Sequence, residues 1–61
     1  MIKNIDQAFE LRGMCYHQMG DFQRALYDFS VAIRIAKENF EDNRTLAGYY
    51  NYAGYQHFEL A

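Results

Sequence analysis

Gly20 and Asp21 interrupt a helical pattern that otherwise occupies the first half of the chain. From 5 to 19 and again from 22 to 37, apolar and small residues recur at intervals of three and four, the spacing of one helix face. Glycine readily adopts the left-handed conformation that ends a helix, and aspartate caps the start of the next one. We therefore predict two helices folded into a tight antiparallel hairpin.

Each predicted helix carries one apolar face. The first face consists of Ile5, Ala8, Phe9, Gly13, Tyr16 and Met19. The second consists of Ala25, Leu26, Phe29, Ala32, Ile33 and Ala36, with Ile35 beside it. The side opposite the second face is expected to carry Arg24, Asp28, Arg34 and Lys37. Asn4 and Gln7 resemble a capping box at the start of the first helix.

A third helix is predicted to begin between Phe40 and Arg44. Its apolar positions are Leu46, Tyr49, Tyr50 and Ala53. Gly54 then repeats the break made by Gly20, and the residues after it are too few to form a stable helix alone. The connection from 38 to 43 contains only asparagines as breakers, and asparagine permits a turn without forcing one.

A chain of 61 residues holds at most one small domain, whose core supplies only about 3–5 kcal/mol. Its single cysteine, Cys15, excludes an internal disulfide. We therefore expect stability to come from neighbouring repeats or from a partner chain. The formal charge of −2 disfavours nucleic acid as a partner. We also expect no signal peptide, no membrane span and, from the lone thiol, a cytoplasmic location.

The first half of the chain resembles a tetratricopeptide repeat, a helical hairpin of about 34 residues. The matching residues are Phe9-x-x-Arg12-Gly13-x-x-Tyr16 and Ala25-x-x-x-Phe29-x-x-Ala32. The resemblance implies an all-α solenoid unit in which four rings fill the space between two helices: Phe9, Tyr16, Phe22 and Phe29. Two positions depart from the family. Arg12 replaces a usual leucine, so either the core is thinner at this position or the arginine stem extends outward. Lys37 replaces a usual proline, so nothing stiff separates the second helix from the third.

Several residues resemble those 34 positions further along the chain, which is the period of the tetratricopeptide family. This offset pairs Gly13 with Ala47, Tyr16 with Tyr50, Arg12 with Leu46 and Gly20 with Gly54. Tyr50 is therefore expected in the core. The resulting division is a lead-in (1–5), a tetratricopeptide-like hairpin (6–39) and a partial second repeat or capping helix (40–61). For Tyr49, Tyr52 and Tyr55, two interpretations stay open: a contact surface or ordinary core packing.

The resemblance also implies a function, because first helices of such repeats line a groove that holds peptides. By position, the groove would present Gln7, Glu10, Met14, His17 and Gln18 from the first helix. The third helix would add Arg44, Thr45, Gly48, Asn51 and Tyr52. Some family members hold a C-terminal carboxylate with lysine and asparagine, but Glu10 and Met14 occupy those positions here. The remaining mix suits an extended segment with a basic residue facing Glu10.

Catalytic and cofactor chemistry has no support in the sequence. Cys15 and His17 lie about 200° apart on a helix, which disfavours both a shared metal and a nucleophile–base pair. His57 could join them only through the tertiary fold. The carboxylates Glu38, Glu41 and Asp42 are interpreted as a solvated cap at a helix start. We expect a non-catalytic chain without a cofactor or metal.

Self-association is the competing interpretation. A solenoid usually needs about three repeats, and this chain has fewer than two. Phe29, Ile33, Tyr49 and Tyr50 would then leave apolar surface open and recruit a second copy. Copies could pack face to face, or the second helix could run straight into the third and exchange it between chains. A helical repeat that reads RNA is disfavoured by the acidic charge balance.

Overall fold

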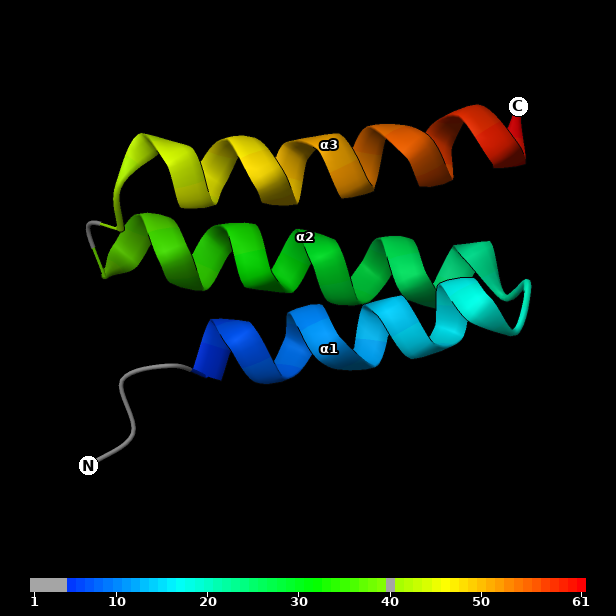
Figure 1. The fold of residues 1–61 in the computed structure, drawn as a ribbon, viewed down its shortest axis with the longest axis horizontal. Helices are drawn as coiled ribbons and strands as arrows, with labels where there is room; N and C mark the ends of the chain where they lie inside the picture. Colours follow the sequence, from blue (N-terminus) through cyan, green and yellow to red (C-terminus); the bar gives the residue numbers. More distant parts are fainter. Residues whose placement is uncertain (1–4, 40) are drawn as a thin grey trace.

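The computed structural model describes residues 5–39 and 41–61, which form three helices (Figure 1). They are α1 (Ile5–Gln18), α2 (Phe22–Glu38) and α3 (Asn43–Leu60). No strand occurs in these two ranges, so the all-α prediction is confirmed. α2 lies between α1 and α3 and runs antiparallel to both (Figure 1). The predicted cap at Asn4, most of the lead-in and the earliest predicted start of the third helix, Phe40, fall outside the described residues.

The turn between α1 and α2 forms as the Gly–Asp pair predicts. Gly20 has a φ of +81°, the left-handed conformation. Two backbone bonds close α1: the Gly20 N–H donates to the His17 carbonyl at 3.0 Å, and the Asp21 N–H donates to the Tyr16 carbonyl at 2.9 Å. The Asp21 carboxylate then accepts from the Arg24 N–H at 3.3 Å. This is a Schellman closure followed directly by an N-cap.

The second turn uses the same devices without a glycine. The Glu41 N–H donates to the Ala36 carbonyl at 3.0 Å, which closes the end of α2. The Asp42 carboxylate accepts from the Thr45 N–H at 2.9 Å and caps α3. The idea that the second helix runs straight into the third is therefore wrong for this structure, because α2 ends at Glu38 and the chain reverses.

The alanine-rich face of α2 forms the centre of the core. Ala25, Ala32 and Ala36 have no exposed surface, and Phe29 is only 1% exposed. Small side chains on α2 let both neighbouring helices approach closely. Leu26 and Ile33 are half-buried at the edges of the two clusters that these residues form. The predicted core face of α2 is thus confirmed.

The predicted apolar face of α1 is only partly correct. Gly13 is buried, and Phe9 and Tyr16 are half-buried against α2. Ile5, Ala8 and Met19 are exposed, because they lie at the edge of the face or, for Met19, in the turn after the helix. A carboxylate takes part of the inward surface instead, since Asp6 is buried.

α3 differs from the prediction in two ways. It continues through Gly54 to Leu60, so the predicted break at Gly54 is wrong. No capping aspartate follows Gly54, whereas Asp21 follows Gly20. The buried positions on α3 are Tyr49, Ala53 and Gln56, spaced by four and three. Tyr50 was expected in the core but is 48% exposed, because it lies about 100° around the helix from Tyr49.

The three other tyrosines of α3 have different surroundings. Tyr49 is core, whereas Tyr52 and Tyr55 are partly packed and partly exposed. The expectation that Phe29, Ile33, Tyr49 and Tyr50 all leave apolar surface open is therefore wrong for Phe29 and Tyr49, which are covered within the chain. Core packing is therefore confirmed for Tyr49, and a contact surface that includes Tyr52 and Tyr55 stays a prediction.

A candidate peptide groove between α1 and α3

Two side-chain hydrogen bonds join α1 to α3 across the face of α2. Near the start of α1, the Tyr49 hydroxyl donates to Oδ2 of Asp6 at 2.8 Å. Near its end, Nδ1 of His17 lies 3.2 Å from Oε1 of Gln56. Because α1 and α3 run in the same direction on either side of α2 (Figure 1), these bonds bridge a groove between the two helices at two levels.

A hollow of about 220 Å³ lies in this groove. Its lining is rich in aromatic and amide side chains and consists of Met14, His17, Gln18, Phe29, Asn51, Tyr52, Tyr55 and Gln56. The Phe29 ring comes from α2 and stacks on Tyr52 with 5.1 Å between ring centroids. We call this feature the groove hollow.

The residues expected from the sequence to face a partner divide into two groups. Five surround the groove hollow: Met14, His17, Gln18, Asn51 and Tyr52. Five lie outside its lining: Gln7 and Arg44, which are exposed, and Glu10, Thr45 and Gly48, which are half-buried. Glu10 nevertheless shares a helix face with Met14, one turn away. Thr45 belongs to the capped first turn of α3.

His17 is held from three sides. Its ring makes edge contacts with Phe22 and Tyr55, at centroid distances of 5.5 and 5.0 Å. Gln56 donates from Nε2 to the Tyr52 carbonyl at 3.1 Å, which leaves Oε1 facing His17. An amide oxygen only accepts, so a hydrogen bond to it requires the form of His17 with a proton on Nδ1. The two ring contacts and Gln56 hold the side chain in position.

Three residues of the hollow were not expected there. The sequence predicts Phe29 in the interhelix core, leaves two interpretations open for Tyr55, and assigns no role to Gln56. Gln56 is 1% exposed, and its spacing of seven from Tyr49 places it on the inward face of α3. That spacing is the sequence feature that indicates burial of Gln56. The polar side chain argues against burial unless its hydrogen-bond partners are known.

Carboxylates gather at the other end of the groove, around the Tyr49 hydroxyl. Burial, the hydrogen bond to Asp6 and the nearby Glu10 and Glu41 all raise the pKa of Tyr49. Burial and the charge of Asp6 raise the pKa of Glu10. In residues 5–39 and 41–61, no lysine or arginine forms an ion pair with these three carboxylates. This end of the groove is therefore negative.

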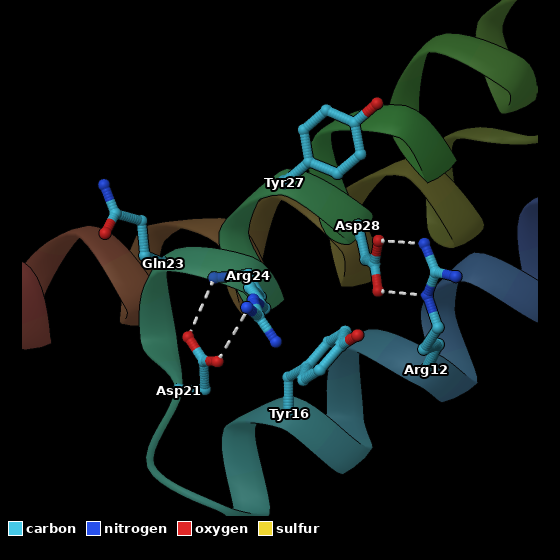
Figure 2. Close-up of a pocket in the computed structure, with 7 residues that line it drawn as sticks. All are labelled: Arg12, Tyr16, Asp21, Gln23, Arg24, Tyr27 and Asp28. Atoms are coloured by element: carbon cyan, nitrogen blue, oxygen red, sulfur yellow. Dashed lines mark hydrogen bonds and ion pairs between the residues drawn. The ribbon is translucent and has the colours of Figure 1, made fainter.

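A larger hollow, of about 600 Å³, lies on α1 and α2 away from the groove hollow (Figure 2). The charged side chains that line it form ion pairs with one another. The Arg12 guanidinium donates to both carboxylate oxygens of Asp28 at 2.8 and 2.9 Å, and Arg24 lies 3.5 Å from Asp21. Both guanidinium groups flank the Tyr16 ring, 6.0 and 5.8 Å from its centroid. These paired charges leave little binding capacity for a ligand.

The Arg12–Asp28 pair corrects one expectation and explains another. Asp28 was placed on the side of α2 away from the core, but it is 1% exposed. The Arg12 side chain remains 56% exposed while its head covers that carboxylate. The expected outward course of the arginine stem is therefore correct, and the hydrogen bonds to Asp28 raise the pKa of Arg12.

Residues 5–39 and 41–61 contain neither a membrane-spanning helix nor a metal-binding cluster. No helix within them is long and apolar enough to cross a membrane. No three His, Cys, Asp or Glu side chains within them lie together as a metal site, and Cys15 is an exposed free thiol. No family model matches the chain, and no curated protein or solved structure matches it significantly.

Proposed function

We propose that the chain is a tetratricopeptide-type module that binds an extended peptide segment of a partner protein between α1 and α3. One observation supports this most. Residues selected by resemblance from two helices more than thirty positions apart, among them Met14 and Tyr52, surround a single hollow. A non-catalytic role without a cofactor belongs to the same proposal, as does a cytoplasmic location, for which the exposed lone thiol Cys15 is the support.

The chemistry of the groove hollow suits an extended backbone. Met14, Phe29 and Tyr52 offer apolar and ring surface to a side chain. Gln18 and Asn51 are exposed amides at its rim, and each amide can both donate and accept hydrogen bonds. An extended segment presents free N–H and C=O groups that such amides can satisfy.

The test is a selection from a phage-displayed library of random peptides on the immobilised chain. Met14→Lys places a charge at the mouth of the hollow, where the methionine is 37% exposed. Leu11→Lys is the matched control, because Leu11 is 63% exposed on α1 and lies outside the hollow. Peptides selected on the wild type should bind the Leu11 variant normally and the Met14 variant at least about tenfold more weakly. Equal binding to both would reject the proposal.

His17 and Tyr52 are less suitable positions for this test. Tyr52 stacks on Phe29, and His17 bonds to Gln56. Their replacement by alanine removes groove surface and packing at once, so weaker binding would have two explanations. Circular dichroism of the Met14 and Leu11 variants should instead show unchanged helix content.

Self-association is a second candidate, favoured by the outer face of α3. Tyr50 is 48% and Phe58 75% exposed, and Ala47 and Gly54, both exposed, lie on the same helix face. A neighbouring copy could cover these rings. Sedimentation equilibrium is the test: the wild type should dimerise at high micromolar concentration and Phe58→Asp should not. A wild-type monomer under these conditions would exclude this candidate.

A further inference from the structure

The groove has an electrostatic direction. Asp6, Glu10 and Met14 follow one another at intervals of four on α1, so they lie along one face. Asp6 and Glu10 are acidic, whereas Met14 begins the lining of the groove hollow. Glu41, in the turn before α3, adds a third negative charge around the Tyr49 hydroxyl. An apolar hollow thus continues into a negative end.

One buried carboxylate oxygen at the negative end lacks a hydrogen-bond donor within the described residues. Oδ2 of Asp6 accepts from Tyr49, but nothing in residues 5–39 and 41–61 donates to Oδ1, although the side chain is 1% exposed. Glu10 is half-buried beside it, and its raised pKa reflects burial and the charge of Asp6. Of the five lysines and arginines in the described residues, three contact other groups: Arg12 contacts Asp28, Arg24 contacts Asp21 and Lys37 contacts the Tyr50 ring. The other two, Arg34 and Arg44, form no ion pair with Asp6, Glu10 or Glu41.

We infer that the groove selects an extended peptide with a bulky apolar side chain two or three residues from a lysine or arginine. The apolar side chain enters the groove hollow, and the cation meets Glu10. This inference rests on the function proposed above. The spacing follows from geometry: four to seven residues of helix separate Glu10 from Met14 and His17, about 6–10 Å, and an extended chain covers about 3.3 Å per residue.

In the test, the peptides enriched by the same phage selection are sequenced, and their affinity is measured for the wild type and three variants. Wild-type selection should enrich lysine or arginine at a fixed distance from a large apolar residue. Glu10→Gln should weaken those peptides about fivefold, the effect of one partly exposed ion pair. Glu10→Lys should shift selection towards Asp or Glu at the same distance. Glu38→Gln is the control, since Glu38 is an exposed carboxylate at the end of α2, outside the hollow lining.

Failure of this inference is distinguishable from failure of the proposed function. Peptides that depend on Met14 but carry no basic residue, or that bind Glu10→Gln as tightly as the wild type, would overturn the basic-residue preference alone. If no enriched peptide discriminates Met14→Lys from Leu11→Lys, the groove itself is not a peptide site. An equal loss in Glu10→Gln and Glu38→Gln would indicate general charge attraction and would also overturn the inference.

Discussion

Replacing Gly13 by alanine tests the closeness of the α1–α2 contact. Gly13 is buried on α1 and faces the ring of Phe29. A Cβ atom at this position would lie 2.9 Å from Cε1 and 3.1 Å from Cδ1 of that ring. The ring cannot easily retreat, because it is 1% exposed and stacks on Tyr52. Gly13→Ala should therefore push α1 away from α2 or disturb the contact with α3.

The magnitude has two opposing parts. Alanine is favoured over glycine inside a helix by about 1 kcal/mol. Overpacking a core typically costs about 1–3 kcal/mol. Gly13→Ala should therefore change the free energy of unfolding by about 0–2 kcal/mol in the destabilising direction. Gly48 provides the matched control: it lies inside α3, and a Cβ there would meet nothing within 4 Å. Gly48→Ala should stabilise by about 1 kcal/mol.

The assay is urea denaturation followed by far-ultraviolet circular dichroism. The difference in the free energy of unfolding between Gly13→Ala and Gly48→Ala cancels the gain in helix propensity. The remaining difference is the steric cost at Gly13, about 1–3 kcal/mol. Gly54→Ala is a second control, since a Cβ at Gly54 also meets nothing within 4 Å. A Gly13 variant as stable as the Gly48 variant would refute the close packing of Gly13 on Phe29.

Three other predictions concern the hydrogen bond from Tyr49 to Asp6, the carboxylate of Glu10 and the turn at Gly20. Tyr49→Phe removes the donor to buried Asp6 and should lower stability by about 1–3 kcal/mol in urea denaturation. Because the pKa of Tyr49 is raised, wild-type stability should also fall above about pH 10, and this loss should be smaller in the variant, which keeps only the raised pKa of Tyr55. The raised pKa of Glu10 means that its ionised form opposes folding, so Glu10→Gln should raise the melting temperature at neutral pH but not below about pH 4, where both states are protonated. Gly20→Ala should destabilise by about 1 kcal/mol because of the φ of +81°, and Gly20→Asn by less; equal denaturation midpoints for these two variants would contradict this.

The elements that sequence reasoning located correctly depend on local chemistry. The alanine-rich face of α2 repeats at helical spacing, and Gly20 and Asp21 each have one dominant role in a turn. Both features can be predicted without knowing which distant residues they contact. Predicting which face of α3 points inward does require the identity of the helices packed against it. The offset that pairs Tyr16 with Tyr50 matches residues by position, but Tyr16 packs on the helix that follows α1, and no helix follows α3 in the described residues. Tyr50 therefore lies on the outer face.

The groove was predictable only in part for a related reason. The resemblance selected five residues, from two helices, that line one hollow in the structure. Burial of Asp6 and Gln56 could not be anticipated, since each polar side chain is acceptable inside only with a partner on another helix. Hydrophobic periodicity assigns such residues to the surface. At the groove's other end, the sequence therefore assigns Glu10 to the groove but misses Asp6, and it predicts only part of the acidic character there.

Arg12 and Asp28 both differ from what is expected at their positions, and one interaction between them accounts for both differences. At position 12 the family resemblance calls for leucine, and at position 28 the helical pattern calls for a solvent-facing residue. In the structure the two meet, and the aspartate is buried at 1% exposure while the arginine stays 56% exposed. An apolar contact at this point would tolerate sliding of α1 along α2. A slide of one helical turn, about 5.4 Å, would separate these two charges and leave the buried carboxylate unpaired. The pair therefore favours this register of the hairpin, and with it the alignment of Met14 and His17 on α1 with Phe29 on α2 in the groove hollow.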